Sequence, residues 1–356
     1  MSRFLSPAME AVTPYQPGSQ PQNTQGVVKL NTNESPFPPP TAVMDAIREE
    51  EMRLHLYPDP CCRQLRQAAA EAYGLQPEQV LAGNGSDEVL YFALRAFCDS
   101  GRPLVFADVT YGFYSCLCSL LGVPAHIIPL RPDLTLDPGD YCGLGQTVVI
   151  ANPNAPTGIA LPPKALARVA ASNPDNVVLV DEAYVDFGAD SCLPLLERYK
   201  NLLVIRTFSK SRQLAGARLG LALGSPELIE DLDRVRTSLN PYNVSRLAQA
   251  AGVASLRQHR FFEETRRQII ECRQWTAGQL ARRGFELTDS KANFLFARTD
   301  AMPGPELFRR LWQQGVLVRR FDTPSRIGDW LRITVGTLEQ MEKVLDAVDT
   351  ALKGEC

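Results

Sequence analysis

The sequence predicts an α/β fold, with a mostly parallel sheet in a large domain and a smaller domain after it. Short apolar segments alternate with helix-like segments over the first two thirds of the chain, as in parallel sheets covered by helices on both faces. A long helical region at about 244–283 then changes this character. The 356 residues also exceed what one simple core needs. We expect a large domain over residues 29–240 and a small α+β domain over 241–356.

The N-terminal segment is expected to be an extended arm. Prolines that block regular structure occur at positions 7, 14, 17, 21, 36, 38, 39 and 40. We assign residues 1–28 to this arm and expect it to pack on the functional site described below. Helices are then predicted from Thr41, a candidate N-cap, to Arg53, and over 61–73, where Gly74 ends the helix.

Strands and helices are predicted to alternate after residue 79. The predicted strands are 80–82, 103–107, 126–128, 147–151, 177–180, 202–206 and 219–223, and the predicted helices are 88–97, 113–121 and 163–171. The small domain is predicted to hold strands at 293–296, 316–318 and 330–334 and a final helix at 338–352. Ligands of parallel α/β sheets bind at the carboxyl ends of the strands, where the polar motifs of this chain occur.

Composition excludes several classes of function. The formal net charge is −3 without any block of like charges, so neither a nucleic acid nor a membrane surface is an expected partner. No apolar stretch approaches the roughly 18 residues of a membrane span, and residues 1–25 lack the apolar core of a secretory signal. The cytoplasm is therefore the expected location. Nine cysteines without a C-x-x-C pair and three distant histidines predict no metal site and no disulfide framework.

Lys210 is the leading candidate for chemistry. It follows the apolar strand Leu202–Arg206, and a lysine just past a buried strand can be desolvated. Its amine is then easier to deprotonate and can attack a carbonyl to form a Schiff base. The hydroxyls of Thr207 and Ser209 and the cation of Arg218 suit a nearby phosphate. This set predicts a lysine that holds pyridoxal phosphate (PLP).

A second candidate phosphate site lies between the strand at 80–82 and the following helix. The turn contains Gly85, Ser86 and Asp87, and the open N–H groups at the start of a helix bind anions. A plain capped turn would have the same residues. Glu88 stands where a dinucleotide fingerprint needs its third glycine, so an NAD site is disfavoured.

Other strand ends carry polar or aromatic residues. Asp181 ends a buried strand, where an unpaired carboxylate is costly; its partner would be a protonated pyridine nitrogen or a protein arginine. Tyr111 follows another strand end and could stack on a flat cofactor or pack in the core. Arg319 and Arg332 stand in apolar surroundings and need an anion, either on a substrate or in a structural ion pair.

The motifs, taken in order, resemble those of the fold type I PLP-dependent aminotransferases over nearly the whole chain. They are Asn33–Glu34, Tyr57–Asp59, Gly83–Glu88, Tyr111–Gly112, Asn154–Gly158, Asp181–Tyr184, Thr207–Lys210 and Arg218. Three further segments resemble the histidinol-phosphate aminotransferase family within that group: Thr13–Gly18, Leu30–Pro36 and Leu331–Thr337.

The resemblance implies a fold, an activity and an assembly. The fold would be a mostly parallel seven-stranded sheet between helices, plus the small α+β domain. With PLP as cofactor, the activity would be amino-group exchange between histidinol phosphate and 2-oxoglutarate in L-histidine biosynthesis. The assembly would be a homodimer whose active sites are shared across the interface.

The resemblance also implies residue roles. Lys210 would form the Schiff base, Asp181 would pair with the pyridinium nitrogen, Tyr184 would hydrogen-bond the phenolic oxygen, and Tyr111 would stack on the ring. The phosphate would be bound by Gly85, Ser86, Asp87, Thr207, Ser209 and Arg218, with Tyr57 reaching the cofactor of the neighbouring subunit. The substrate would face Tyr15, Asn33, Arg319 and Arg332.

The chain departs from the family pattern at one position. The family usually has an asparagine directly before Pro-Thr-Gly, bonded to the phenolic oxygen, and this chain has Ala155 there. We expect Asn154, one residue earlier, to take that role if the turn is shifted. Otherwise Tyr184 alone would hold the oxygen.

Three alternatives share most of these features. An aromatic amino-acid aminotransferase would use the same scaffold, since arginine also binds a carboxylate. A PLP-dependent threonine-phosphate decarboxylase would use the same apparatus to break a different bond. A non-catalytic binding module on this fold is disfavoured because Lys210, Asp181 and Tyr184 are all present.

Overall fold

The computed structural model describes residues 2–10, 12–21 and 26–353. Parts of the predicted arm (1, 11 and 22–25) and the last residues of the predicted small domain (354–356) therefore lie outside the described residues. No helix within the described ranges is long and apolar enough to span a membrane.

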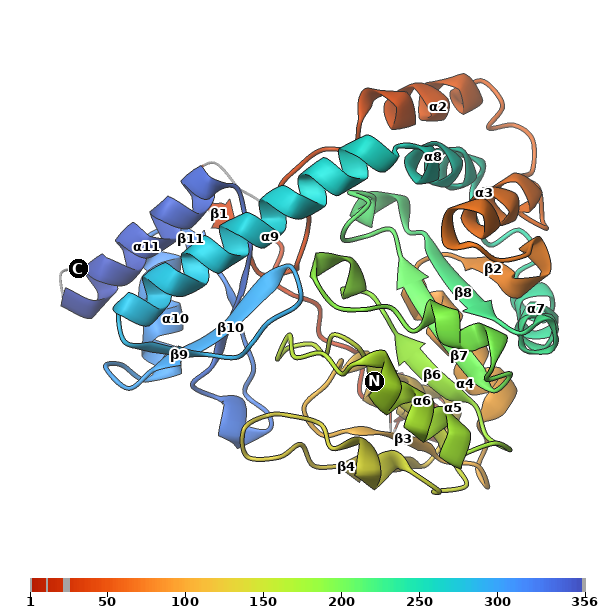
Figure 1. Ribbon diagram of the computed structural model, residues 1–356, viewed down its shortest axis with the longest axis horizontal. Helices are drawn as coiled ribbons and strands as arrows, with labels where there is room; N and C mark the ends of the chain where they lie inside the picture. The colour runs from red at the N-terminus through yellow and green to blue at the C-terminus, as the bar shows by residue number, and fades with distance from the viewer. Residues whose placement is uncertain (1, 11, 22–25, 354–356) are drawn as a thin grey trace.

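A seven-stranded sheet forms the centre of the larger part of the molecule (Figure 1). The five strands β4–β3–β5–β6–β7 run parallel, while β8 is antiparallel to both β7 and β2. This confirms the predicted mostly parallel sheet. The strands are β2 (Val80–Gly83), β3 (Leu104–Ala107), β4 (Ala125–Ile128), β5 (Thr147–Ala151), β6 (Val178–Asp181), β7 (Leu202–Thr207) and β8 (Gly220–Gly224).

Helices cover both faces of this sheet because its strands are largely apolar and their alternate side chains point to opposite faces. Val178 and Val180 of β6 belong to one core cluster, and Leu179 between them belongs to the other. The first cluster is completed by α3 (Arg63–Tyr73), α6 (Pro163–Ser172) and α8 (Arg246–Arg257), with α2 (Thr41–Glu51) packed on α8. The second is completed by α4 (Ser86–Phe97), α5 (Phe113–Leu121) and α7 (Pro226–Leu239).

The smaller part of the molecule is built on a four-stranded antiparallel sheet in the order β12–β13–β10–β9. Its core also takes in a two-stranded pair, in which β1 lies parallel to β11. The strands are β1 (Val28–Lys29), β9 (Phe285–Leu287), β10 (Phe294–Thr299), β11 (Val316–Leu317), β12 (Arg319–Arg320) and β13 (Leu331–Thr334); the helices are α9 (His259–Arg282), α10 (Gly304–Gln313) and α11 (Leu338–Lys353).

Three details of the chain path differ from the sequence-based expectations. The helical region at 244–283 is two helices, α8 and α9, and α8 packs on α2 and α3 beside the large sheet. Thr41 is the first residue of α2, and Pro40 holds the N-cap position. Among its described residues, the arm contains one helical turn, α1 (Pro7–Glu10), and no other helix. The division into 29–240 and 241–356 stays a proposal.

Candidate active site

A cavity of about 870 Å³ lies at the carboxyl ends of the parallel strands and is closed on its other side by residues of the arm and of the small sheet. Most of the residues singled out in the sequence line this one cavity, which brings together segments more than 300 positions apart. They are Tyr15, Asn33, Ser86, Asp87, Tyr111, Asp181, Tyr184, Thr207, Ser209, Lys210, Arg218, Arg319 and Arg332.

Lys210 reaches the cavity from the turn that follows β7. The turn is fixed by backbone bonds on both sides of it, from Phe208 N to Leu219 O and from Leu214 N to Phe208 O. The Lys210 Nζ donates to the carbonyl of Thr32 at 3.2 Å and lies 5.7 Å from the centre of the Tyr184 ring. The amine is therefore held beside a phenol, with one backbone carbonyl as its hydrogen-bond acceptor.

The start of α4 forms a cup for an anion. Ser86 and Asp87 open the helix, and Arg218 reaches across to pair with Asp87 at 3.1 Å. Helix N-terminal N–H groups beside a guanidinium suit a phosphate. Gly85 precedes the helix with φ +86, and a Cβ there would lie 2.6 Å from Arg218 Nη2. Gly85 therefore leaves room for the arginine rather than lining the cavity.

Two hydroxyl residues complete this cup. The Thr207 hydroxyl donates to Ser209 Oγ at 3.0 Å, and both side chains are buried at the end of β7. Gly220 of β8 was not among the predicted site residues, and a Cβ there would lie 2.4 Å from the backbone nitrogen of Ser86. Only glycine lets β8 approach the start of α4 this closely.

Asp181 ends β6 as a buried carboxylate that faces the cavity. Its Oδ2 accepts a hydrogen bond from the Tyr114 hydroxyl at 2.8 Å, and its Oδ1 accepts one from the backbone N–H of Ala183 at 3.2 Å. Burial raises the pKa of the carboxyl to about 6. No arginine among the described residues pairs with Asp181, and the buried Arg206 pairs with Glu182 and Asp186 instead.

Tyr114 was not identified from the sequence. It lies on α5 and is wholly buried, and an aromatic residue at helical spacing in an apolar helix is indistinguishable from ordinary core. Burial and the adjacent Asp181 raise the pKa of its hydroxyl well above the usual value, so that it remains a hydrogen-bond donor to the carboxylate.

Tyr111 and Tyr184 both line the cavity. The Tyr111 hydroxyl donates to Asp87 Oδ1 at 2.9 Å, and burial followed by the charge of Asp87 raises the pKa of this tyrosine. The Tyr184 hydroxyl accepts from Asn33 Nδ2 at 2.9 Å, and its ring packs edge-to-face on Phe294 with 5.1 Å between ring centres. Both side chains are therefore held in place by contacts with neighbouring protein residues.

The structure does not bring Asn154 into the cavity, which corrects the expectation for this residue. Its Nδ2 donates to the Val109 carbonyl at 2.9 Å and to Thr157 Oγ1 at 3.1 Å, and its Oδ1 accepts from Thr110 at 2.8 Å. The amide thus joins its own turn to the loop after β3. Ala155 lines the cavity in its place and offers only a methyl group.

Tyr57 also lies outside the cavity. Its side chain is 77% exposed and stacks on Tyr242 with 4.5 Å between ring centres. The backbone around it is held by Arg246 at the start of α8, which donates to the Tyr57 carbonyl at 2.7 Å and pairs with Glu50 at 2.8 Å. The predicted role of Tyr57 in a neighbouring subunit is taken up as a proposal below.

Arg319 and Arg332 stand opposite each other on the paired strands β12 and β13. Arg319 donates to the carbonyls of Gln16 and Pro17 at 3.1 and 3.3 Å, and Arg332 donates to the carbonyl of Asn31 at 3.0 Å. The Nε of Arg332 has no hydrogen-bond partner among the described residues. Within residues 2–10, 12–21 and 26–353, no carboxylate forms an ion pair with either arginine.

Withdrawal from water gives these two arginines unusual electrostatics. Burial lowers the pKa of Arg332, and the positive charge of Arg319 acts in the same direction. Burial also raises the pKa of Tyr15, which lies beside both guanidinium groups. Two adjacent cations without a carboxylate are an incomplete arrangement that an anionic ligand would complete.

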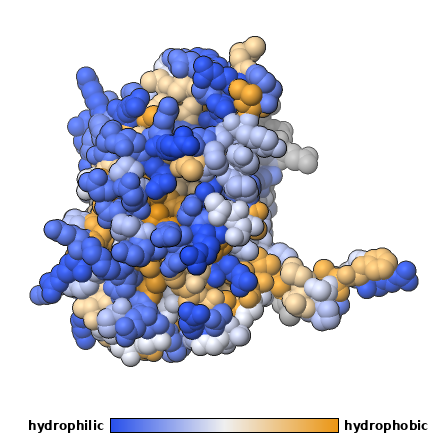
Figure 2. Space-filling model, turned by 90° about the vertical axis from the view of Figure 1, so that its right-hand side faces the viewer, coloured by the Kyte–Doolittle hydropathy of each residue, from blue (hydrophilic) through white to orange (hydrophobic). Residues whose placement is uncertain are grey.

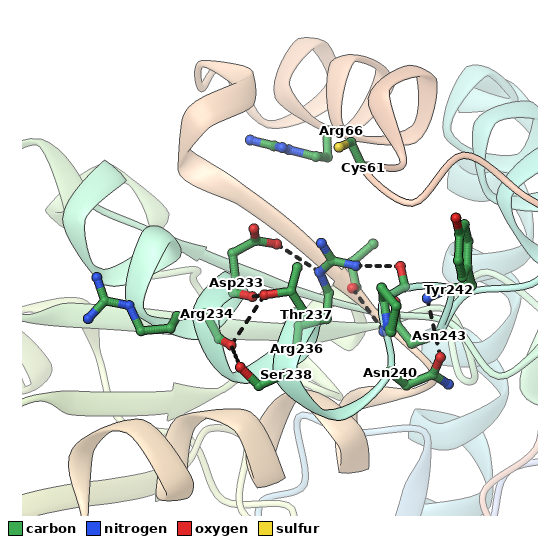
Figure 3. Close-up of polar contacts among 12 residues, drawn as sticks. Cys61, Arg66, Asp233, Arg234, Arg236, Thr237, Ser238, Asn240, Tyr242 and Asn243 are labelled. Carbon is green, nitrogen blue, oxygen red and sulfur yellow. Dashed lines mark hydrogen bonds and ion pairs between the residues drawn. The ribbon is translucent and has the colours of Figure 1, made fainter.

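A smaller cavity of about 290 Å³ lies between α3 and α7, and none of the residues predicted to be functional lines it. Arg236 of α7 is buried beside it, donating to Asp233 at 2.7 Å and to the Pro241 carbonyl at 2.9 Å (Figure 3). These bonds hold the turn that leads to Tyr242. Among the described residues there is no cluster of histidine, cysteine and carboxylate side chains that could bind a metal.

Comparison with known proteins agrees with this geometry. The model of the family "Aminotransferase class I and II" matches residues 25–348. The chain is 50% identical to histidinol-phosphate aminotransferase 1 of Bradyrhizobium diazoefficiens, over 98% of this chain and 99% of that protein. It is 45% identical to the histidinol-phosphate aminotransferase of Pseudomonas putida, over 98% of this chain and 100% of that protein.

Solved structures show the same fold. The histidinol-phosphate aminotransferase of Sinorhizobium meliloti, solved in complex with pyridoxal-5'-phosphate, superposes with a TM-score of 0.89 at 24% identity, covering 100% of this chain and 99% of that one. The identity to curated relatives extends over nearly the whole length of both partners. The chain therefore belongs to the class I and II aminotransferases and, within them, to the histidinol-phosphate aminotransferase family.

Proposed function

We propose that this protein is a PLP-dependent aminotransferase that moves an amino group between histidinol phosphate and 2-oxoglutarate, in the cytoplasm, as a step of L-histidine biosynthesis. The observation that carries the proposal is that one cavity holds Lys210, a cup for one anion around Arg218, and a second, unpaired cationic site at Arg319 and Arg332. One anionic site suits the cofactor, and the other suits an anionic substrate.

The cavity residues fit PLP. Lys210 would hold it covalently. Asp181, which forms no ion pair with any described residue, would pair with the ring nitrogen. The cup at the start of α4 would hold the phosphate, and Tyr184 would bond the phenolic oxygen. When bound, PLP supplies an electron sink for cleavage of a bond to the amino-bearing carbon of the substrate.

The protein residues have separate tasks in this reaction. Lys210 would be the base that takes the proton from the amino-bearing carbon of the substrate. Asp181 keeps a negative charge beside the ring nitrogen, and Tyr114 orients that carboxylate. Arg319 and Arg332 bind the phosphate of histidinol phosphate in one half-reaction and a carboxylate of 2-oxoglutarate in the other.

We further propose a homodimer with shared active sites. Large apolar and aromatic side chains are exposed in the segment after α2. They are Met52 (85% exposed), Leu54 (60%), Leu56 (53%) and Tyr57 (77%), and Tyr242 before α8 is also exposed (42%). Figure 2, which views the molecule from the α2 and α3 side, shows apolar residues among the hydrophilic ones on this surface. A partner subunit would cover them and receive Tyr57 at its phosphate cup.

The test has a cofactor arm and a substrate arm. Purified protein with PLP should show a visible absorbance band that borohydride removes and that the Lys210→Ala variant lacks. In single half-reactions, histidinol phosphate should react faster than phenylalanine, tyrosine or threonine phosphate, and initial rates with 2-oxoglutarate should give parallel ping-pong lines. A colourless wild type, or a preference for an unphosphorylated aromatic amino acid, would contradict the proposal.

A further inference from the structure

We propose that Asn33 and Thr334 fix the direction of the Tyr184 hydroxyl, so that it acts only as a hydrogen-bond donor toward the cavity. Asn33 is in this reading a positioning residue that acts through Tyr184. The inference rests on the proposed function, because the oxygen that receives this hydrogen bond is the phenolic oxygen of PLP.

The hydrogen bonds around Asn33 form a chain with one direction. The backbone N–H of Asn33 donates to Thr334 Oγ1 at 3.0 Å, and the Thr334 hydroxyl donates to Asn33 Oδ1 at 3.0 Å. The Nδ2 of the same amide then donates to the Tyr184 hydroxyl oxygen at 2.9 Å. A backbone N–H can only donate, so the direction of the first bond sets the direction of the others.

The opposite orientation of the amide is unfavourable. If the oxygen and nitrogen of the Asn33 side chain exchanged places, Thr334 Oγ1 would accept two hydrogen bonds, and its own proton would lose its acceptor. Thr334 and Asn33 are 2% and 1% exposed, so water does not replace the lost bond. Leaving a buried hydroxyl without a hydrogen-bond partner costs free energy, and this cost selects the observed orientation.

The Tyr184 hydroxyl proton can form a hydrogen bond only toward the cavity. Its oxygen already accepts from Asn33, and within residues 2–10, 12–21 and 26–353 the structure gives its O–H no acceptor. The residue lines the cavity, so the proton is free to bind a ligand oxygen there. Ala155 adds no donor on this side, which makes Tyr184 the main donor to that oxygen.

The Asn33 backbone supports a fixed geometry. Its φ of +56 lies in the left-handed region, which asparagine and aspartate tolerate better than most residues. Its carbonyl accepts from Asn293 Nδ2 at 3.1 Å, and its N–H is bound by β13 through Thr334. Strand β13, which carries Arg332, thus also orients the Tyr184 hydroxyl through Thr334 and Asn33.

Several other charged or titratable groups act on Tyr184 and remain in place in the variants below. They are Lys210 from the turn after β7, Arg332 from β13, Tyr15 from the arm, Tyr111 from the turn after β3 and Tyr114 from α5.

The test is a pH titration of the visible band of the PLP-loaded enzyme. At high pH the phenolic oxygen carries a negative charge that no neighbouring proton offsets, so a donor there stabilises the high-pH form and lowers the midpoint. Asn33→Asp places an acceptor opposite Tyr184 and draws its proton away. We expect this variant to raise the midpoint by roughly one pH unit, the equivalent of one hydrogen bond to a charged group.

Thr334 supplies a matched pair of variants with less risk to folding. Thr334→Ser keeps the hydroxyl and should titrate as the wild type does, whereas Thr334→Val keeps the shape, removes the relay and should raise the midpoint in the same direction as Asn33→Asp. In the Tyr184→Phe variant the hydroxyl is absent. Adding Asn33→Asp to this variant should therefore raise the titration midpoint less than it does in the wild type.

The outcomes separate the inference from the proposed function. A coloured wild type with unshifted midpoints in both Asn33→Asp and Thr334→Val overturns the inference and leaves the proposed function intact. A wild type that binds no PLP contradicts both. A raised midpoint in Thr334→Val with a normal midpoint in Thr334→Ser supports the relay, because a general loss of packing would not distinguish these two variants.

Discussion

Arg206 and Arg332 are both arginines within strands, but their partners differ: Arg206 pairs with carboxylates, whereas Arg332 donates to a backbone carbonyl. Arg206 of β7 is 6% exposed and pairs with Glu182 at 2.9 Å and Asp186 at 2.8 Å. The attraction of the two carboxylates raises its pKa despite burial. Arg332 of β13 has carbonyl and aromatic neighbours, one nitrogen without a partner and a lowered pKa.

The difference separates structure from function. A buried cation with its own carboxylates is complete, and its removal would leave those carboxylates unpaired. A cation that is withdrawn from water without a carboxylate is complete only when a ligand brings the anion. The ion pairs of Arg206 also help to hold the backbone next to Lys210. Ser211 directly follows Lys210, and its hydroxyl donates to the Asp186 carboxylate at 2.5 Å.

The largest expected effect is on stability at Arg206. Arg206→Met should lower the free energy of unfolding by about 3–5 kcal/mol, because Glu182 and Asp186 lose their cation. The matched control, Arg332→Met, should change it by less than about 1 kcal/mol, since no carboxylate is left behind. Urea unfolding of both variants checks this, and equal destabilisation of the two would remove the contrast.

Asp181 is the carboxylate counterpart of Arg332, and it predicts a pH effect. Its pKa of about 6 in the folded protein lies above the usual 3.8, so its contribution to stability is present at low pH and is lost as the pH rises through 6. By linkage, cofactor-free wild type should lose about 3 kcal/mol relative to Asp181→Asn between pH 4 and pH 8. Unfolding at both pH values measures this.

Bound PLP should remove that pH effect, because its protonated ring nitrogen would be the cationic partner of the Asp181 carboxylate. The loaded wild type should therefore show little loss of stability relative to Asp181→Asn over the same pH range. A pH-independent difference in the cofactor-free protein would show that Asp181 is satisfied by Tyr114 alone.

A smaller effect is expected from inorganic phosphate on the PLP-loaded enzyme, in which the cup at α4 is already filled. Phosphate at ten times its dissociation constant should stabilise the wild type by about 1.4 kcal/mol through Arg319 and Arg332. Thermal unfolding should show this shift in wild type and not in Arg332→Gln. The same shift in both proteins would place the phosphate elsewhere.

Much of the site was predictable because residues at the ends of parallel strands meet at one edge of the sheet. Lys210, Asp181 and Ser86 were found in this way. Arg218, which precedes the antiparallel strand β8, was found because it follows Lys210 closely in the sequence. The structure places all four around one cavity. Most of the strands were also predictable, because continuous apolar runs are typical of buried parallel sheets.

The remaining features depend on tertiary contacts that no local pattern shows. Tyr114 and Thr334 each look like ordinary core or strand residues, and only the fold brings them to Asp181 and Asn33. Asn154 was expected to replace the family's asparagine at the position of Ala155, but its amide is bound by Val109 and Thr110 instead.

The most direct test of the account is whether Arg319 and Arg332 recognise the substrate anion. The values of kcat/KM for histidinol phosphate and for histidinol, which lacks the phosphate, should be compared in wild type and in Arg319→Gln/Arg332→Gln. We predict that the wild type prefers the phosphorylated substrate by at least about 100-fold and that the double variant retains less than about 10-fold. A double variant with the full preference of the wild type would contradict the account.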